Sequence, residues 1–193
     1  MDSNKLKIIG VFALVFALTV TLVACDMNDN GPLNGNDNGN GNDQIGTRDN
    51  PAEIGERLYL EFEDIFEGEV EMNIVLLEIV RGEEANEMVQ EANQFNPEPD
   101  EGEEYLLAKF EVEVEYVEEE PFDINHAQFD AVSEGGTVYD DFLSVADLDP
   151  NLRNDLYEGA VHEGWTYFLV DIEDSPLIAY HRTTDYEVWF DAN

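Results

Sequence analysis

The stretch Ala108–Tyr116, which reads Ala-Lys-Phe-Glu-Val-Glu-Val-Glu-Tyr, decides the fold class because apolar and charged side chains alternate along it. Successive side chains of a β-strand point to opposite faces of a sheet, so this period of two predicts a strand with one face in a core and the other in solvent. The same alternation over 58–63 and 69–74 predicts two further strands. The expected core face of the first stretch consists of Ala108, Phe110, Val112, Val114 and Tyr116.

Shorter strands are expected toward the C-terminus. The segment 137–139 follows a Gly-Gly turn, and 165–172 is apolar on nearly both faces, as a central strand would be. The segments 177–180 and 186–190 supply the last two strands.

One segment, Glu83–Phe95, has the spacing of a helix. Its acidic first turn suits the positive end of the helix dipole, and Pro97 prevents the helix from running on. Many short strands with one inserted short helix predict an all-β fold, an immunoglobulin-like antiparallel β-sandwich. The apolar side of the helix would carry Ala85, Met88, Val89, Ala92 and Phe95.

Several turns and strand starts are similar to those of a recurrent family, the telokin-like, immunoglobulin-type domain of unknown function in lipoproteins of Gram-positive bacteria. The resemblance covers roughly residues 50–191, although this chain is far more acidic than the family pattern. It implies an extracytoplasmic interaction module and supplies no catalytic residues. The motifs that carry it are Asn50–Gly55, Gly102–Leu106, Gly136–Tyr139, Leu156–Gly159 and Gly164–Phe168.

The N-terminus has the layout of a signal sequence, with Lys5 and Lys7 before an apolar run over 8–23. Leu22–Cys25 resembles the lipobox that bacterial lipoprotein signal peptidase recognises. That resemblance implies that Cys25 receives a diacylglyceryl group and becomes the first residue of the mature protein. The alternative is an uncleaved membrane helix, since the run is about as long as a short span. Both interpretations place residues 26–193 outside.

Cys25 is the only cysteine of the chain. With its sulfur lipidated, no disulfide, cysteine-based zinc site or cysteine nucleophile is expected in the folded domain. The segment between the anchor and the domain is rich in Asn, Gly and Asp, so it buries too little apolar surface to offset its ordering entropy. We therefore expect a signal peptide over 1–24, a flexible tether over 25–49 and a β-sandwich domain over 50–193.

Acidic residues dominate the composition. Removal of residues 1–24 takes one of the 46 acidic and two of the 8 basic residues, which leaves 45 and 6 and a formal charge of −39. Such a surface repels nucleic acid and anionic lipid, so we expect no nucleic-acid partner. The excess is either a solvated acidic coat or a surface that recognises cations or basic peptides. The expected contacts are the membrane, through the lipid on Cys25, and an extracellular protein partner.

The residue inventory argues against catalysis. None of the mature chain's serines lies in a Gly-x-Ser-x-Gly elbow or has a lysine three residues later, and the histidines lack metal-ligand spacing. Paired carboxylates carry little weight because any fold with 45 acids brings some pair together. Aromatic residues could form a sugar-stacking platform, but core packing is the better interpretation. The aromatics in question are Trp165, Trp189, Tyr167 and Tyr180, and the histidines are His126, His162 and His181.

The segment Asp147–Glu158 places acidic or amide oxygens at positions 1, 3, 5, 9 and 12, the ligand spacing of an EF-hand calcium loop. Leu152 stands where the sharp turn needs Gly, and Pro150 stands at position 4, so the alternative is an exposed acidic loop between strands. Weak calcium is the only cofactor that the sequence suggests. Its candidate ligands are Asp147, Asp149, Asn151, Asp155 and Glu158.

Two function classes remain open from the sequence alone. The first is a non-catalytic interaction or sensing module, lipid-anchored at the extracytoplasmic face of the cell membrane. The second is an extracellular solute- or cation-binding protein that uses its acidic surface. Exposed clusters of aromatic rings would favour the second class, and buried rings would favour the first.

Overall fold

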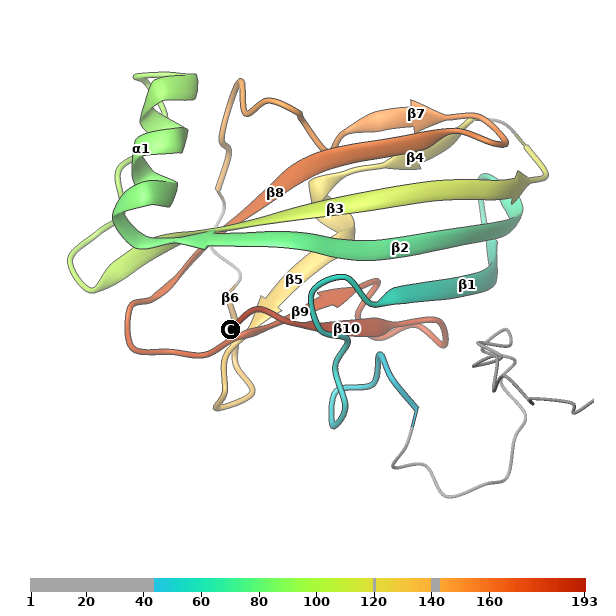
Figure 1. Ribbon diagram of the computed structural model, residues 1–193, viewed down its shortest axis with the longest axis horizontal. Coiled ribbons are helices and arrows are strands. Elements are labelled where there is room, and N and C mark those ends of the chain that lie inside the picture. Colours follow the sequence, from blue (N-terminus) through green and yellow to red (C-terminus); the bar gives the residue numbers. More distant parts are fainter. Residues whose placement is uncertain (1–43, 120, 140–142) are drawn as a thin grey trace, which may run out of the picture. The chain divides into compact units, whose positions relative to one another are not determined.

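The computed structural model describes residues 44–119, 121–139 and 143–193. Cys25, the expected signal peptide and most of the expected tether lie outside the described residues. The described helices and strands belong to an all-β sandwich with one short α-helix (Figure 1). In these three ranges no helix is long and apolar enough to cross a membrane.

The first sheet contains the four longest strands, all antiparallel to their neighbours, in the order β1-β2-β3-β8. Alternating burial along β1 and β3 shows why they form a half-solvated sheet: their apolar residues face inward and their charged residues face outward. The strands are β1 (Arg57–Asp64), β2 (Gly68–Arg81), β3 (Glu103–Val117) and β8 (Val161–Asp171).

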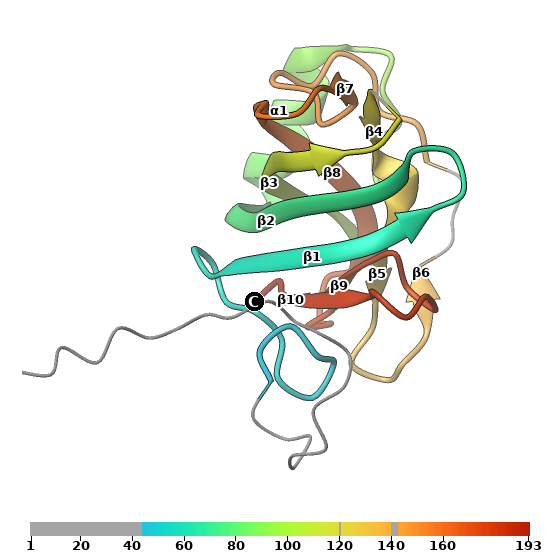
Figure 2. The ribbon, with the colours of Figure 1, turned by 90° about the vertical axis from the view of Figure 1, so that its right-hand side faces the viewer.

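The second sheet has shorter strands in the order β10-β9-β5-β6, and a separate pair joins β4 to β7. Figure 2 shows the two four-stranded sheets as separate layers. The bounds are β4 (Phe122–Ile124), β5 (Phe129–Val132), β6 (Val138–Tyr139), β7 (Asn154–Leu156), β9 (Leu177–Tyr180) and β10 (Val188–Asp191), with a 3-10 turn at His126–Gln128.

The main core lies between the sheets and is built around aromatic rings. Phe110 of β3 lies 4.8 Å from Phe129 of β5 and 5.0 Å from Phe190 of β10, measured between ring centroids. All three side chains are buried. Because rings from both sheets meet here, this contact holds the two layers together. The predicted immunoglobulin-like antiparallel β-sandwich is confirmed.

A β-bulge corrects the expected core face of β3. Val114 pairs with Met72 and Tyr116 pairs with Glu71, so Glu115 is the extra residue on β3. An extra residue reverses the alternation beyond it. Tyr116 is therefore 37% exposed, and Val117 takes the buried position instead.

Helix α1 (Gly82–Ala92) covers the outer face of the first sheet at one end, where it forms a second core with residues such as Tyr105 and Trp165. The helix ends at Ala92, earlier than the expected Phe95, whose side chain is 86% exposed. The Asn93 side-chain oxygen accepts a hydrogen bond from the Phe95 backbone N–H. This local bond ends the helix before Pro97 can do so.

The folded domain starts before residue 50, which corrects the expected tether. The Trp189 N–H of β10 donates to the Gly46 carbonyl, and the Ala52 N–H donates to the Trp189 carbonyl. Arg48 lies over the Trp189 ring at 5.5 Å. Residues 46–52 therefore cover the edge of β10, because backbone hydrogen bonds compensate for the ordering of this polar segment.

Candidate functional site

Strand β1 is the long free edge of the sandwich. It pairs with β2 on one side, and among the described residues no backbone hydrogen bond joins 57–64 to another segment. The β10 edge is covered by 46–52, and at the β8 edge Asn151 forms a bridge with Trp165. A free edge presents a row of backbone donors and acceptors, which is a template for pairing with another chain.

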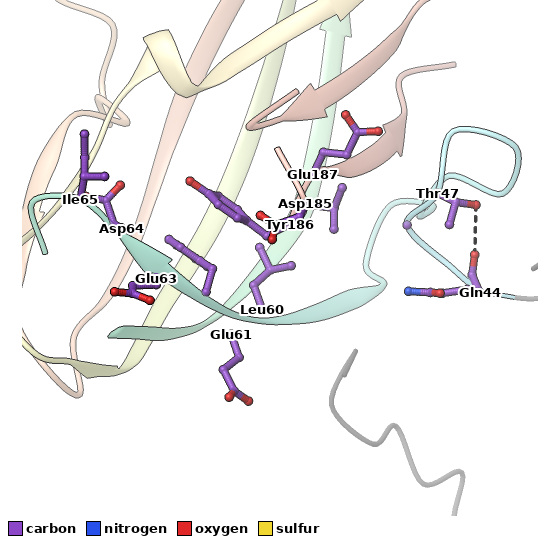
Figure 3. A pocket seen from close by; sticks show the side chains of 13 residues that line it. Gln44, Thr47, Leu60, Glu61, Glu63, Asp64, Ile65, Asp185, Tyr186 and Glu187 are labelled. Atoms are coloured by element: carbon purple, nitrogen blue, oxygen red, sulfur yellow. Dashed lines mark hydrogen bonds between the residues drawn. The ribbon is translucent and has the colours of Figure 1, made fainter. Parts of the chain in front are cut away.

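A groove of about 540 Å³ runs beside β1. Three segments that lie far apart in the sequence line it: 60–65 of β1 and its turn, 185–188 before and in β10, and the N-terminal residues Gln44, Gly46 and Thr47. Figure 3 shows Tyr186 in the middle of the groove with Leu60 on the same side of β1. The Tyr186 ring stacks on the Phe62 ring at 4.3 Å. The groove therefore has apolar side chains beside the free edge, and its lining also includes the acidic residues Asp64, Asp185 and Glu187.

The solvent face of β1 is acidic. Glu61 lies directly opposite Glu71 of β2, and Glu63 lies opposite Glu69. Like charges that face each other across strands are destabilising. Figure 3 shows Glu61 pointing away from Tyr186, toward the outer face of the sheet. A second hollow on that face, about 410 Å³, is lined in part by Glu61, Glu63 and Glu69.

Four cations of the described residues form ion pairs elsewhere. Arg57 forms ion pairs with Glu111 at 2.9 Å and with Glu113 at 2.7 Å. Two further ion pairs join Lys109 to Glu163 and Arg81 to Glu104. Arg182 holds Asp130 in the second sheet. In the described ranges, no ion pair reaches Glu61 or Glu63. The acidic row on β3 thus has cationic partners, whereas in the described part of the chain the two glutamates on the free edge form no ion pair.

The turn between β1 and β2 closes the site at one end. Asp64 Oδ1 accepts hydrogen bonds from the backbone N–H groups of Phe66 and Glu67, at 2.7 and 3.3 Å. This cap fixes the turn and leaves Ile65 88% exposed and Phe66 79% exposed. Two adjacent exposed apolar side chains at the tip of a strongly acidic domain are available for a partner contact.

The carboxyl groups of Asp64 and Glu67 lie within hydrogen-bonding distance of each other beneath this turn. Burial, then the hydrogen bond and charge of Asp64, raise the pKa of Glu67 to about 7. Burial alone would raise the pKa of Asp64, but hydrogen bonds from the Glu67 side chain and from backbone N–H groups lower it. Burial also lowers the pKa of His181, which lies near Asp64. The raised pKa of Glu67 lies near neutral pH, and the cluster joins the β1–β2 turn to the β9–β10 loop.

The structure does not gather the five predicted calcium ligands into a site. Asp147 Oδ2 accepts a hydrogen bond from the Asn93 side chain, Asn151 Oδ1 accepts one from the Arg153 N–H, and Asp155 lies in β7 opposite Asp123. The expected loop is therefore interrupted by a strand. Among the described residues no three His, Cys, Asp or Glu side chains are placed to hold a metal ion.

Calcium binding by Asp147, Asp149, Asn151, Asp155 and Glu158 stays a prediction. Isothermal titration of the full chain with calcium tests it, with an expected dissociation constant of about 10⁻⁴ to 10⁻³ M. Heat that disappears in Asp147→Ala with Glu158→Ala would support the site. No heat at millimolar calcium would eliminate it.

The four aromatic residues considered for sugar stacking do not form an exposed platform. Trp165, Trp189 and Tyr180 are buried, and the half-buried Tyr167 stacks on His126 at 4.1 Å. The core-packing interpretation is confirmed for the first three.

The three histidines lie in three different environments. His126 hydrogen-bonds Thr166, His162 contacts the Asn151 carbonyl, and His181 lies against Tyr186 at 5.1 Å between ring centroids. No pattern in the sequence predicted the edge groove. The only sequence signal for it was the pair of glutamates at alternate positions on a predicted strand.

Comparisons with known proteins give no family. No protein-family model matches the chain, and no curated protein matches it either. The proposed membership in the telokin-like lipoprotein family therefore stays a prediction.

Three solved structures share 13% sequence identity with this chain. The ycdA protein of Bacillus subtilis, a proposed lipoprotein, aligns over 68% of this chain and 38% of its own length with a TM-score of 0.45. The yjhA protein of Bacillus subtilis aligns over 74% and 100%, with a TM-score of 0.47. The secreted protein MPT63 of Mycobacterium tuberculosis aligns over 72% and 95%, with a TM-score of 0.49. The chain thus spans well under half the length of the ycdA protein.

Proposed function

We propose that this chain is a lipid-anchored, extracytoplasmic interaction module that performs no catalysis and binds a protein partner through the β1 edge of its sandwich. The lipid would be attached to Cys25, at the end of the lipobox-like sequence Leu22–Cys25. The expected tether that follows would separate the domain from the bilayer.

The free edge of β1 carries this proposal. An edge strand of eight residues in a monomeric protein is normally covered, interrupted by proline or a bulge, or protected by charged side chains, and β1 carries only the last of these, such as Glu61 and Glu63. Here no described segment pairs with the outer side of this edge, and the adjacent turn exposes Ile65 and Phe66. Exposed apolar side chains beside a groove are features of a docking surface.

Anchoring and binding are tested separately in the native envelope. Cys25→Ala should release the protein from the membrane, since only that sulfur can carry the lipid, and globomycin should leave the unprocessed form. Normal processing and retention of the Cys25→Ala variant would contradict the anchor.

Two exposed phenylalanines give a matched pair for the binding test. A photoreactive phenylalanine analogue replaces Phe66 at the β1–β2 turn in one full-length variant and Phe95 in the other. Phe95 follows α1, which lies at the opposite end of the first sheet (Figure 1). We expect a discrete cross-linked protein from position 66 that position 95 does not give. Identical products from both positions, or none from position 66, would contradict the edge as the binding face.

A further inference from the structure

We propose that the free edge of β1 accepts an extended segment of the partner protein as an added strand, with lysine or arginine at alternate positions beside Glu61 and Glu63. The residues between these cations would be apolar and would face the groove. This inference rests on the proposed function and names the chemistry of the partner segment.

The backbone of β1 offers the first part of this recognition. Its inner side is paired with β2 over all eight residues, from Arg57 opposite Val75 to Asp64 opposite Gly68. Among the described residues nothing pairs with its outer side. An added strand would complete that row of hydrogen bonds, as in known cases of strand addition to an exposed sheet edge.

The two faces of β1 differ, and they set the side-chain pattern of the added strand. On the inner face, Leu60 and Phe62 are buried at the groove, beside Tyr186. On the outer face, Glu61 and Glu63 project into solvent. Because the side chains of a strand alternate between faces, a segment that alternates apolar and basic residues fits both.

The charge of the outer face selects a basic segment. Glu61 faces Glu71 and Glu63 faces Glu69, and no cation of the described chain is paired with either edge glutamate. A lysine or arginine on the added strand would flank each edge glutamate on the side away from the β2 glutamate that it faces. Opposite charges in neighbouring strands are stabilising, so such a strand would offset repulsion that is already built into the sheet.

Two other occupants fit this edge less well. Residues 26–43 of this chain contain four aspartates and no lysine or arginine, so their charge is wrong for the site. A second copy that pairs through β1 would bring two rows with Glu61 and Glu63 together. Both cases place acid beside acid, which disfavours the pairing.

The test uses the lipidated full chain in detergent micelles and a blocked, fluorescent nine-residue peptide that alternates lysine and valine. We expect saturable binding by fluorescence anisotropy. Glu61→Gln with Glu63→Gln should weaken the affinity by about 2- to 30-fold, because two opposite-charge pairs are lost. Glu98→Gln with Glu101→Gln, at two exposed acidic positions between α1 and β3, makes the same change in net charge and should leave the affinity unchanged.

Backbone pairing is tested with two further peptides, one N-methylated at its lysines and one at its valines. In an added strand the N–H groups of alternate residues point to the same side, so only one of these two sets can face β1. We expect one methylated peptide to lose binding at least about tenfold and the other to keep it. Amide hydrogen exchange over 57–64 should slow on binding.

Equal binding of both methylated peptides, or no effect of the Glu61 and Glu63 changes, would overturn strand addition. If deletion of residues 26–43 tightens peptide binding, this segment of the chain itself occupies the β1 edge and competes with the peptide. If the peptide does not bind, and if the chain forms a dimer that Glu61→Gln with Glu63→Gln strengthens, the β1 edge pairs with a second copy of the chain. Both results would overturn the proposal. Partner-specific cross-linking from position 66 without peptide selectivity would leave the proposed function standing and reject only this inference.

Discussion

At the scale of single residues, Gly164 shows how a missing side chain allows two segments to cross. A Cβ at this position of β8 would overlap the backbone of Leu152 and the carbonyl carbon of Asn151. The crossing segment is held there by the Trp165 N–H, which donates to the Pro150 carbonyl at 2.9 Å. Only glycine gives the two backbones room to approach this closely.

We expect Gly164→Ala to lower the free energy of unfolding by about 2–4 kcal/mol, because the crossing segment must move away from β8. Urea unfolding of the full chain in detergent measures this change. Gly135→Ala is the control, since a Cβ there meets only the Ser133 side chain at an ordinary 3.7 Å. A loss no larger for Gly164→Ala than for Gly135→Ala would contradict the steric explanation.

The carboxyl pair beneath the β1–β2 turn makes stability depend on pH. The pKa of Glu67 is raised to about 7 from an ordinary value of 4.5, so the folded state binds this proton more tightly than the unfolded state does. Its contribution to stability is complete below pH 4.5 and is lost as the pH rises through 7. The groups around it are Asp64 of β1, His181 and Tyr186 of the β9–β10 loop, Tyr180 of β9 and the Asp123 backbone of β4.

Glu67→Gln keeps a hydrogen-bond donor toward Asp64 and removes the titration. We expect the variant to match the wild type near pH 5 and to melt about 2–4 °C higher at pH 8, which corresponds to about 1 kcal/mol for a chain of this size. His181 titrates in both proteins, so the difference in Tm isolates Glu67. Glu98→Gln, at an exposed position, should show no pH-dependent difference. A constant offset for Glu67→Gln between pH 5 and 8 would argue against the raised pKa of Glu67.

At the scale of elements, helix α1 depends on one buried amide. The Asn96 Nδ2 donates to the Val89 carbonyl at 2.8 Å and to the Ala146 carbonyl at 3.0 Å, and its Oδ1 accepts from the Ala146 N–H at 2.8 Å. This side chain thus ties the end of the helix to the segment that carries Val145 and Leu148 of the second core. Buried backbone groups that lose their partners are costly.

Asn96→Ala should lower the free energy of unfolding by about 2–4 kcal/mol, because it leaves the N–H and carbonyl of Ala146 without their partner and removes one of the two hydrogen bonds to the Val89 carbonyl. Gln94→Ala removes an exposed amide two residues away and should change it by less than about 0.5 kcal/mol. Chemical unfolding of both variants compares them directly. If the two variants lose similar amounts of unfolding free energy, the hydrogen bonds of Asn96 add little to the packing of α1.

Sequence reasoning found the long strands of the first sheet and, among the short strands of the second, β6, β9 and β10. Alternation located β1, β2 and β3, a segment apolar on nearly both faces located β8, and the bounds of β9 agreed with the expected 177–180. Three strands of three or four residues, β4, β5 and β7, were missed because such short segments show no period. The bulge at Glu115 was also missed, since a continuous alternation in the sequence gives no sign of an extra residue.

The candidate site could not be predicted for a different reason. Its lining comes from 44–47, 60–65 and 185–188, which meet only because β1 ends one sheet and the approach to β10 lies beside it. The order of strands within sheets is a property of the packed fold, and no local pattern encodes it. The sequence did indicate the acidic character of the surface, which the site uses.

At the scale of the whole molecule, charge is the dominant feature. The chain carries 46 acidic and 8 basic residues, a formal net charge of −38. Among the described residues, the basic side chains that form ion pairs are those of Arg57, Arg81, Lys109 and Arg182. Most carboxylates therefore have no cationic partner, and their mutual repulsion is stronger in the compact state than in the unfolded chain.

Added sodium chloride should therefore raise Tm, because it screens exposed charges over a Debye length that falls from about 30 Å at 0.01 M to about 10 Å at 0.1 M and about 3 Å at 1 M. We expect most of the rise below about 0.3 M, where screening changes fastest. An uncharged osmolyte at the same osmolality should not reproduce that saturating curve. A Tm that is indifferent to salt, or that rises linearly with both additives, would contradict charge repulsion as the cause.

The facing pair Glu63 and Glu69 separates local from diffuse repulsion. Removing both charges in Glu63→Gln with Glu69→Gln relieves a direct cross-strand contact as well as two units of net charge, so we expect a higher Tm than wild type at 0.01 M salt. Glu98→Gln with Glu101→Gln removes the same net charge at two exposed loop positions and should gain less. Both gains should shrink at 1 M salt as the repulsion is screened. Equal gains from the two double variants would mean that net charge, and not the facing row on β1 and β2, sets the salt dependence.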